Sequence, residues 1–226
     1  MADISLVRHL EIFDPKDAPS VTIIGAGATG SRVFASLVEL GCTHITVCDF
    51  DFVEAHNLAN QIYTRADIGS TKVLACADWY ERKVGRPAPI EMRFCSQRIP
   101  DDQIEMSQVV FLLTDTMSSR REIFDACLKD NYKVTHVIET RMASSYGNVL
   151  IFDPCHGGQS TRWLNTLIDD NDAEVSACGS AISVGPTAAI IANLAVWRFI
   201  QACNGKGPAF RTNLFLDPEY IIAEAA

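Results

Sequence analysis

The feature that most limits how this chain can fold is a glycine-rich turn between an apolar strand and an amphipathic helix. Gly25, Gly27 and Gly30 form the pattern G-x-G-x-x-G at the end of the β-branched run at residues 20–25. Residues 29–40 follow with apolar side chains at helical spacing. In this setting the first glycine permits a tight turn, the second lets the backbone approach a phosphate, and the third lets helix and strand pack closely. The turn therefore predicts a nucleotide-binding α/β fold.

Segments of strand and helix character alternate along the rest of the chain. Further strands are expected at residues 43–50, 90–95, 107–115, 134–140 and 146–154. Helices are expected at residues 70–85, 118–130 and 186–203, and the tail at 210–218 is expected to add an edge strand. This alternation predicts a Rossmann-like, mostly parallel sheet with helices on both faces and antiparallel additions towards the C-terminus.

Two stretches fall outside the alternation. Residues 1–19 are interpreted as an N-terminal arm, and residues 157–180, which are polar and rich in Asp, Asn, Ser and Gly, as an irregular crossover loop. The chain has neither an internal repeat nor a linker-like segment. We therefore expect residues 1–226 to form one domain.

Composition narrows the classes of function. The formal net charge of -9 argues against a general nucleic-acid binder, which needs a basic face. The N-terminus does not read as a secretion signal, and no apolar run is long enough to span a membrane. The eight cysteines are scattered without a C-x-x-C pair, so zinc is not expected. Most of them are expected to be buried thiols in a reducing cytoplasm.

The stretch after the second strand carries the residues expected to bind the nucleotide. Asp49 follows Gly30 by about 20 residues, the usual distance for an acid that binds ribose hydroxyls. Further polar groups follow within a short stretch: Asp51, Asn57, Asn60, Gln61 and Lys72. Amides can donate to phosphate oxygens and a lysine adds a point charge, so this set favours a polyphosphate. Taken alone, the stretch is equally compatible with a polar surface loop.

A carboxylate follows the fourth expected strand. Asp115 ends the apolar run at 107–115, and ligands of open α/β sheets bind beyond the carboxyl ends of the strands. A carboxylate there can hold Mg²⁺ against nucleotide phosphates. The alternative is that Asp115 caps the helix that begins near Ser118.

The stretch from Asp49 onwards resembles the ThiF/MoeB/ubiquitin-activating family of adenylyltransferases. That family follows its glycine loop with D-x-D-x-V-x-x-x-N-L-x-R-Q and then G-x-x-K. The matching positions here are Asp49, Asp51, Val53, Asn57, Leu58, Asn60, Gln61, Gly69 and Lys72. The resemblance implies that Asp49 holds the ribose, and that Asn57, Gln61 and Lys72 contact ribose and phosphates.

The chain departs from this pattern at Asn60, where the family has an arginine that contacts the triphosphate. The pattern N-x-A-N-Q at residues 57–61 is similar to that of a ThiF-like subgroup found in phage and bacterial genomes. Asn60 donates a hydrogen bond but carries no charge. Three arginines are candidates to replace that charge, namely Arg65, Arg141 and Arg8. By the same resemblance, Arg8 lies near where family members have an arginine that reaches the site of a neighbouring subunit.

The resemblance also points to a cysteine. Cys178 precedes the apolar helix that begins at Pro186, where family members that activate sulfur carriers have a functional cysteine. That cysteine forms a thioester, persulfide or acyl-disulfide after adenylation, and its thiolate is the nucleophile. Cys155 is the second candidate, and an ordinary cysteine at position 178 is the alternative.

The resemblance implies an enzyme that uses ATP and Mg²⁺ to adenylate the C-terminal carboxylate of a ubiquitin-like, ThiS-like or MoaD-like protein or peptide. It also implies a homodimer. Two alternatives stay open. Without the arginine's charge at Asn60, the chain could be a non-catalytic nucleotide-binding scaffold. An NAD(P)-dependent oxidoreductase would account for the glycines and Asp49, but not for the later amides, Lys72 or Asp115.

Overall fold

The computed structural model of the protein describes residues 5–101, 104–170 and 184–225. Within them, eight strands form one sheet in the order β3-β2-β1-β4-β5-β6-β7-β8. The strands are β1 Val21–Ile24, β2 Ile45–Cys48, β3 Arg93–Cys95, β4 Val109–Leu112, β5 His136–Met142, β6 Tyr146–Phe152, β7 Arg211–Leu216 and β8 Glu219–Glu224. The first five strands run parallel, and β6, β7 and β8 continue the sheet as antiparallel neighbours.

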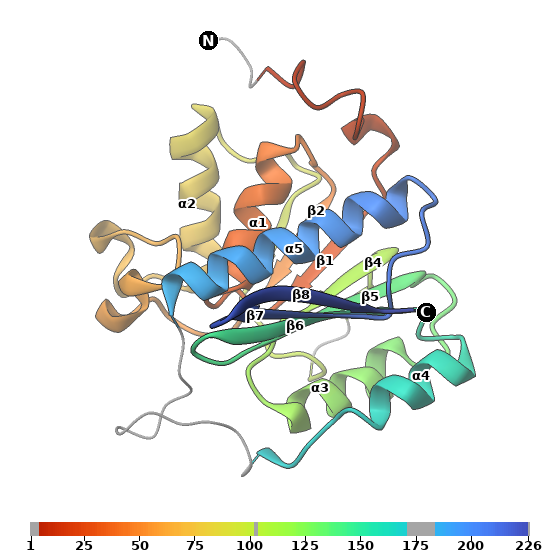
Figure 1. Cartoon of the computed structure of the whole chain (residues 1–226). Helices are drawn as coiled ribbons and strands as arrows, with labels where there is room; N and C mark the ends of the chain where they lie inside the picture. Colours follow the sequence, from red (N-terminus) through yellow and green to blue (C-terminus); the bar gives the residue numbers. More distant parts are fainter. Residues whose placement is uncertain (1–4, 102–103, 171–183, 226) are drawn as a thin grey trace.

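Helices cover both faces of this sheet. Figure 1 shows α1, α2 and α5 on one face and α3 and α4 on the other. Their bounds are α1 Gly30–Glu39, α2 Lys72–Val84, α3 Met117–Ile123, α4 Gly157–Leu164 and α5 Gly185–Cys203. Short 3-10 helices cover Pro15–Asp17, Ala55–Ala59 and Arg65–Asp67, and a π-helical turn, Phe124–Leu128, extends α3. Among the described residues, no helix has both the length and the apolar character that crossing a membrane requires.

Each face of the sheet carries its own apolar core. On the α5 face, Phe111 packs against Phe199 with ring centroids 5.9 Å apart. On the α4 face, Trp163 is fully buried and stacks on Phe152 at 4.9 Å. The strands between these cores are buried on both sides, and β1, β2 and β4 accordingly read as continuous apolar runs.

The parallel register brings the carboxyl ends of β1, β2, β4 and β5 to one edge of the sheet, called here the carboxyl edge. Ile24 pairs with both Cys48 and Leu112, and Leu112 pairs with Glu139. The loops that leave these four strands therefore emerge side by side. This is the edge at which ligands of open α/β sheets bind.

The Rossmann-like class, the mostly parallel sheet and the antiparallel additions are confirmed. Two local expectations are wrong. Residues 157–164 form α4, because Trp163 inserts into the core behind a His156 side chain that caps the helix. The strand expected at the sheet edge, β7, is an inner strand, because β8 pairs along its whole length.

Candidate functional site

The glycine turn packs directly against neighbouring backbone. Gly25 has φ +95°, and a Cβ there would lie 2.7 Å from the carbonyl oxygen of Leu113. A Cβ on Gly30 would lie 1.8 Å from the carbonyl oxygen of Gly25, so only glycine fits. A Cβ on Gly27 would meet nothing within 4 Å. The turn thus touches the loop after β4, while Gly27 faces open space beside the N-terminus of α1, a favourable place for an anion.

Two side chains hold the turn in place. The amide of Ala26 donates to Oδ2 of Asp49 at 2.6 Å, and the amide of Asp51 donates to Oδ1 of the same carboxylate at 2.8 Å. The hydroxyl of Tyr63, which the sequence analysis did not single out, donates to the carbonyl oxygen of Ala26 at 2.7 Å. Burial raises the pKa of Asp49, while Lys72 and the two amides oppose that shift. Asp49 is therefore at the turn, where the ribose-binding role requires it.

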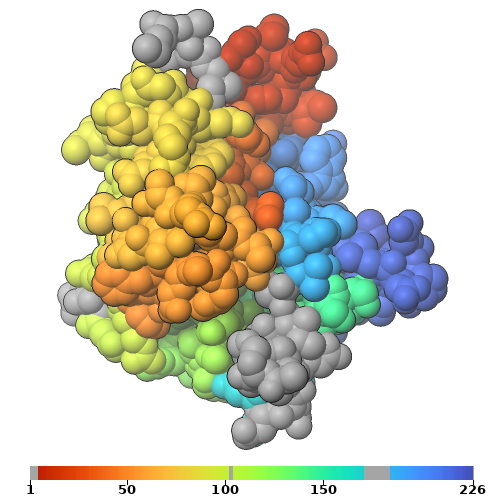
Figure 2. Space-filling view, turned by 90° about the vertical axis from the view of Figure 1, so that its left-hand side faces the viewer, coloured from red at the N-terminus to blue at the C-terminus, as the bar shows by residue number. Residues whose placement is uncertain are grey.

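Lys72 lies at the start of α2 and faces the same region. Its ammonium Nζ lies 2.6 Å from Oδ2 of Asp51, and its own amide donates to the carbonyl oxygen of Asp51 at 2.9 Å. Asn57 is buried and its Oδ1 accepts from the amide of Glu54 at 2.9 Å. A hollow of about 380 Å³ lies here, lined by Phe50, Asp51, Phe52, Glu54, His56, Asn57 and Lys72. Figure 2 looks onto this side, where the residues after β2 (orange) cover much of the surface.

Gln61 and Asn60 lie next to the first turn of α1. The amide of Ile62 donates to the Ser31 hydroxyl at 3.4 Å, which docks this segment on the helix. The Oε1 atom of Gln61 is buried, and in the part of the chain that the structure describes it has no hydrogen-bond partner. The carbonyl oxygen of Asn60 accepts from Nε of Arg32 at 3.2 Å. Arg32 is a second residue that the sequence analysis missed.

Asp115 is exposed at the carboxyl edge, in the loop after β4. The N-cap of α3 is Thr116, whose hydroxyl accepts from the amide of Ser119 at 3.2 Å. The alternative that Asp115 caps this helix is therefore wrong. Among the described residues, no group of three or more His, Cys, Asp or Glu side chains is placed to hold a metal ion. A single carboxylate is nonetheless a usual protein contribution to Mg²⁺ when nucleotide phosphates and waters supply the other ligands.

Arg141 lies at the carboxyl edge as expected, but its guanidinium is engaged. It contacts Glu139 at 2.6 Å through Nε and donates to the carbonyl oxygen of Thr166 at 2.6 Å. Glu139 is fully buried, and its carboxylate also accepts hydrogen bonds from Nη1 of Arg120 at 2.9 Å and from the indole N–H of Trp163. Burial alone would raise the pKa of Glu139, but the two guanidinium groups hold it below its usual value. The guanidinium of Arg141 is thus engaged by Glu139 and Thr166, and its contact with phosphates stays a prediction.

The other two arginine candidates, Arg65 and Arg8, are both exposed. Arg65 is exposed in a 3-10 helix. Arg8 is exposed on the N-terminal arm, which packs near Gly41 and the end of α5, at the edge opposite the glycine turn. Within one chain, Arg8 therefore cannot reach the nucleotide region.

Of the two cysteine candidates, the structure describes only Cys155. Cys178 lies outside the described residues. Cys155 follows β6, whose end, Phe152, pairs with Val137 near the start of β5, so Cys155 lies at the edge away from the glycine turn. Burial and the nearby Asp153 raise the pKa of the Cys155 thiol, which disfavours the nucleophilic thiolate.

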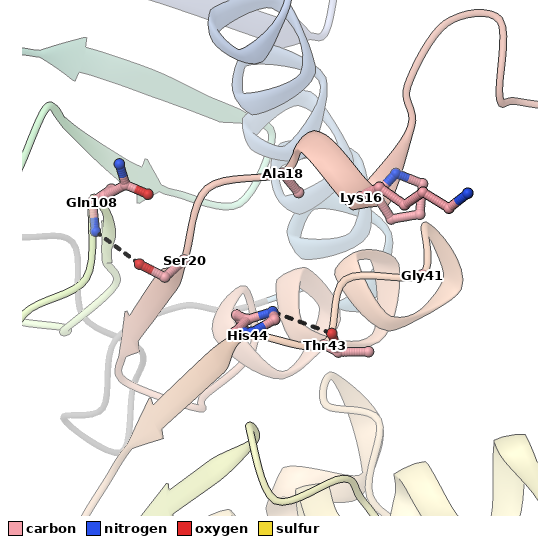
Figure 3. Close-up of a pocket in the computed structure, with 8 residues that line it drawn as sticks. Lys16, Ala18, Ser20, Gly41, Thr43, His44 and Gln108 are labelled. Carbon is pink, nitrogen blue, oxygen red and sulfur yellow. Dashed lines mark hydrogen bonds between the residues drawn. The ribbon is translucent and has the colours of Figure 1, made fainter.

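A second hollow, of about 430 Å³, lies at the edge opposite the carboxyl edge. Figure 3 shows Ser20, Gly41, Thr43, His44 and Gln108 around it. These residues precede β1, β2 and β4 or follow α1. Because the strands begin here, this hollow lies away from the strand ends at which ligands bind in this fold.

The carboxyl edge, in contrast, combines the groups that a nucleotide requires. It offers a backbone turn with room for a phosphate at Gly27, a carboxylate for ribose hydroxyls at Asp49, and a cation at Lys72. A further carboxylate, Asp115, stands one loop away. The Oε1 of Gln61 is a buried acceptor in the same segment, without a hydrogen-bond partner among the described residues.

Comparisons with known proteins identify the family and the fold of the chain. The profile of the ThiF family matches residues 15–219. The sulfur carrier protein ThiS adenylyltransferase of Escherichia coli K12 is 27% identical over 219 residues, which is 94% of this chain and 82% of that protein. The crystal structure of PaaA has a TM-score of 0.71 at 18% identity, covering 98% of this chain and 78% of that one. That of Escherichia coli MccB with ATP has a TM-score of 0.68 at 14% identity, covering 96% and 66%.

The glycine turn yields a matched pair of substitutions. Gly30→Ala places a methyl group against the Gly25 carbonyl and should lower the free energy of unfolding by about 1–3 kcal/mol or more. Gly27→Ala has open space for its methyl group and should have a free energy of unfolding close to that of the wild type. Urea unfolding followed by circular dichroism measures both. Equal stability of the two variants would contradict this packing.

The buried ion cluster makes a second prediction. Glu139→Gln leaves the buried guanidinium of Arg120 and the partly buried one of Arg141 without a carboxylate. It should lower the free energy of unfolding by about 3–5 kcal/mol at pH 7. Because the folded-state pKa of Glu139 is depressed, its contribution is present above the unfolded pKa of about 4.3 and is lost as the pH falls below it. The gap between wild type and variant should therefore shrink in acid.

Glu105→Gln is the control for that prediction. Glu105 forms an exposed pair with Lys133, so its substitution should change the melting temperature little at any pH. A Glu139→Gln variant as stable as Glu105→Gln at pH 7 would show that the buried cluster is not what holds β5 and α3 together.

Proposed function

Because the chain belongs to the ThiF family, we propose that it is an ATP-dependent adenylyltransferase that activates the C-terminal carboxylate of another protein or peptide. The observation that carries the proposal is the convergence of the glycine turn, Asp49, Lys72 and the Asp115 loop at one edge of the sheet. The name of the Escherichia coli relative supports the reaction class.

Each group at this edge has a part in binding ATP. The amides at the glycine turn and the N-terminus of α1 face the phosphates, which they can bind without a counter-charge. Asp49 and Gln61 accept from the ribose hydroxyls, since a carboxylate oxygen has room for a second donor. Lys72 compensates phosphate charge while Asp51 holds its ammonium in place. Asn57 and Asn60 add amide donors from the same segment.

Asp115 is proposed to hold Mg²⁺. The ion neutralises phosphate charge when it is bound, and a hard carboxylate oxygen is the donor that it prefers. Asp115 is exposed beside the loop that touches Gly25, so its carboxylate is accessible from the phosphate region. Arg120 donates to the carbonyl oxygen of Thr114 and so fixes the backbone immediately before Asp115.

The chemical step follows from these positions. An oxygen of the partner's C-terminal carboxylate attacks the α-phosphorus of ATP. The bond from that phosphorus to the bridging oxygen breaks, pyrophosphate leaves with the electron pair, and an acyl adenylate remains. No proton has to be moved by a side chain, so catalysis consists of positioning and charge neutralisation.

We propose a ubiquitin-like or sulfur-carrier-like protein as the partner, of the kind named for the ThiS adenylyltransferase. An acyl transfer to Cys178 is proposed as a second step. The thiolate attacks the carbonyl carbon of the adenylate, the bond to AMP breaks, and a thioester forms. The assembly is proposed to be a cytoplasmic homodimer.

ATP–pyrophosphate exchange with purified ThiS-type and MoaD-type carriers tests the reaction. Carrier-dependent exchange is the expected result. Binding of Mg-ATP without exchange by any carrier would favour the nucleotide-binding scaffold, since Asn60 lacks the charge of an arginine.

Asp115→Ala should reduce carrier-dependent exchange about 100-fold or more, because it removes the proposed ligand of Mg²⁺. Exchange is measured with radiolabelled pyrophosphate over a Mg²⁺ titration. Asp125→Ala, which removes an exposed carboxylate from the π-helical turn, is the control and should behave as wild type. Near-normal exchange by Asp115→Ala would end this assignment.

Cys178→Ala should leave exchange intact and abolish any covalent adduct with the carrier. The adduct is detected as a mass increase of the intact protein after incubation with carrier and Mg-ATP, and its loss on treatment with hydroxylamine identifies a thioester. An adduct that survives in Cys178→Ala would move the assignment to another cysteine, and Cys155→Ala is the next variant to test.

A further inference from the structure

We propose that Arg32 is the arginine that binds the polyphosphate of the nucleotide, an inference that rests on the function proposed above. Arg32 lies in the first turn of α1, directly after the glycine turn. Side chains in a helix tilt towards its N-terminus, so a residue at this position leans towards the space beside Gly27. No motif marks Arg32 in the sequence.

The guanidinium of Arg32 is held in a fixed place. Its Nε donates to the carbonyl oxygen of Asn60 at 3.2 Å, across the boundary between α1 and the segment that carries the nucleotide-binding amides. Its Nη2 lies 3.8 Å from the point where a Cβ on Gly185 would stand, and that same point is 2.9 Å from the carbonyl oxygen of Ala59. Arg32 therefore occupies the junction of α1, residues 59–60 and the start of α5.

Arg32 is anchored through Nε, which suits an arginine that binds a ligand through its terminal nitrogens. The bond through Nε sets the plane of the guanidinium and leaves the two terminal nitrogens as paired donors, the arrangement that matches phosphate oxygens. Gly185, at the start of α5, has no side chain to extend towards Nη2. The side chain is half-buried, which reduces the screening of its charge by water.

Three other cations near the carboxyl edge are already paired with carboxylates. Lys72 contacts Asp51 at 2.6 Å, and Arg120 and Arg141 share the buried Glu139. Within residues 5–101, 104–170 and 184–225, Arg32 makes no ion pair, and its recorded partner is a neutral carbonyl. It is thus a positioned charge whose compensation a phosphate can supply.

This placement also accounts for the neutral side chain at Asn60. The backbone of that residue, rather than its side chain, fixes a guanidinium at this point, so the charge comes from α1 instead of from residue 60. A substitution that returns an arginine to residue 60 should then restore function to a chain that has lost Arg32.

The test compares Arg32→Gln, Arg32→Lys and the double variant Arg32→Gln with Asn60→Arg by calorimetric titration with Mg-ATP and with adenosine. Arg32→Gln should weaken Mg-ATP binding about 10-fold or more, with adenosine binding changed less than about twofold, because only ATP carries phosphates. Arg32→Lys should bind Mg-ATP with intermediate affinity, since it keeps the positive charge and loses the paired donors of the guanidinium. The double variant should regain most of the affinity.

Arg86→Gln is the matched control, since it removes an exposed arginine just beyond the C-terminal end of α2. It should bind Mg-ATP as wild type does. Wild-type affinity in Arg32→Gln would overturn the inference, and so would a parallel loss for ATP and adenosine, which indicates a structural role. If the wild type itself binds no Mg-ATP, the proposed function fails and the inference falls with it; wild-type binding with an unaffected Arg32→Gln refutes only the inference.

Discussion

The contact between the glycine turn and the ends of its neighbouring strands is the constraint on which the site depends. Gly30 brings α1 within reach of the Gly25 carbonyl, and Asp49 binds the Ala26 amide from the end of β2. Gly25 in turn packs on the backbone of Leu113 at the end of β4. Three strand ends are therefore fixed relative to one helix N-terminus. Every polar group assigned to the nucleotide is positioned relative to that point.

Charge is distributed unevenly in this acidic chain, and the distribution shapes the site. The buried carboxylate of Glu139 requires two arginines, since a buried charge without partners is costly. In meeting that requirement the cluster joins β5, α3 and the loop before Asp115, and it also engages the guanidinium of Arg141. We therefore propose that backbone amides at the glycine turn carry much of the phosphate binding.

Much of this could be predicted from the sequence, because the signals are local. The glycine turn, the strand alternation and the cap of α2 at Thr71 each depend on residues a few positions apart. The contacts that were missed join distant segments. Tyr63 reaches Ala26, and Arg32 reaches Asn60, through hydrogen bonds that no spacing rule marks. The sequence places Arg141 at the end of a strand, and for that reason it was expected to face phosphate. The sequence does not indicate that Arg141 pairs with a buried acid two residues earlier, Glu139.

The most direct test of the central claim is the melting temperature of the protein with Mg-ATP compared with NAD⁺ and NADH. A ligand at about 100 times its Kd adds about 2.7 kcal/mol to the free energy of unfolding, which for a chain of this size corresponds to a rise of about 5–10 °C. The account predicts that rise with Mg-ATP and little change with either nicotinamide nucleotide. A rise with NAD⁺ or NADH alone would contradict it, and would mean that the segment after β2 had been wrongly assigned to a triphosphate.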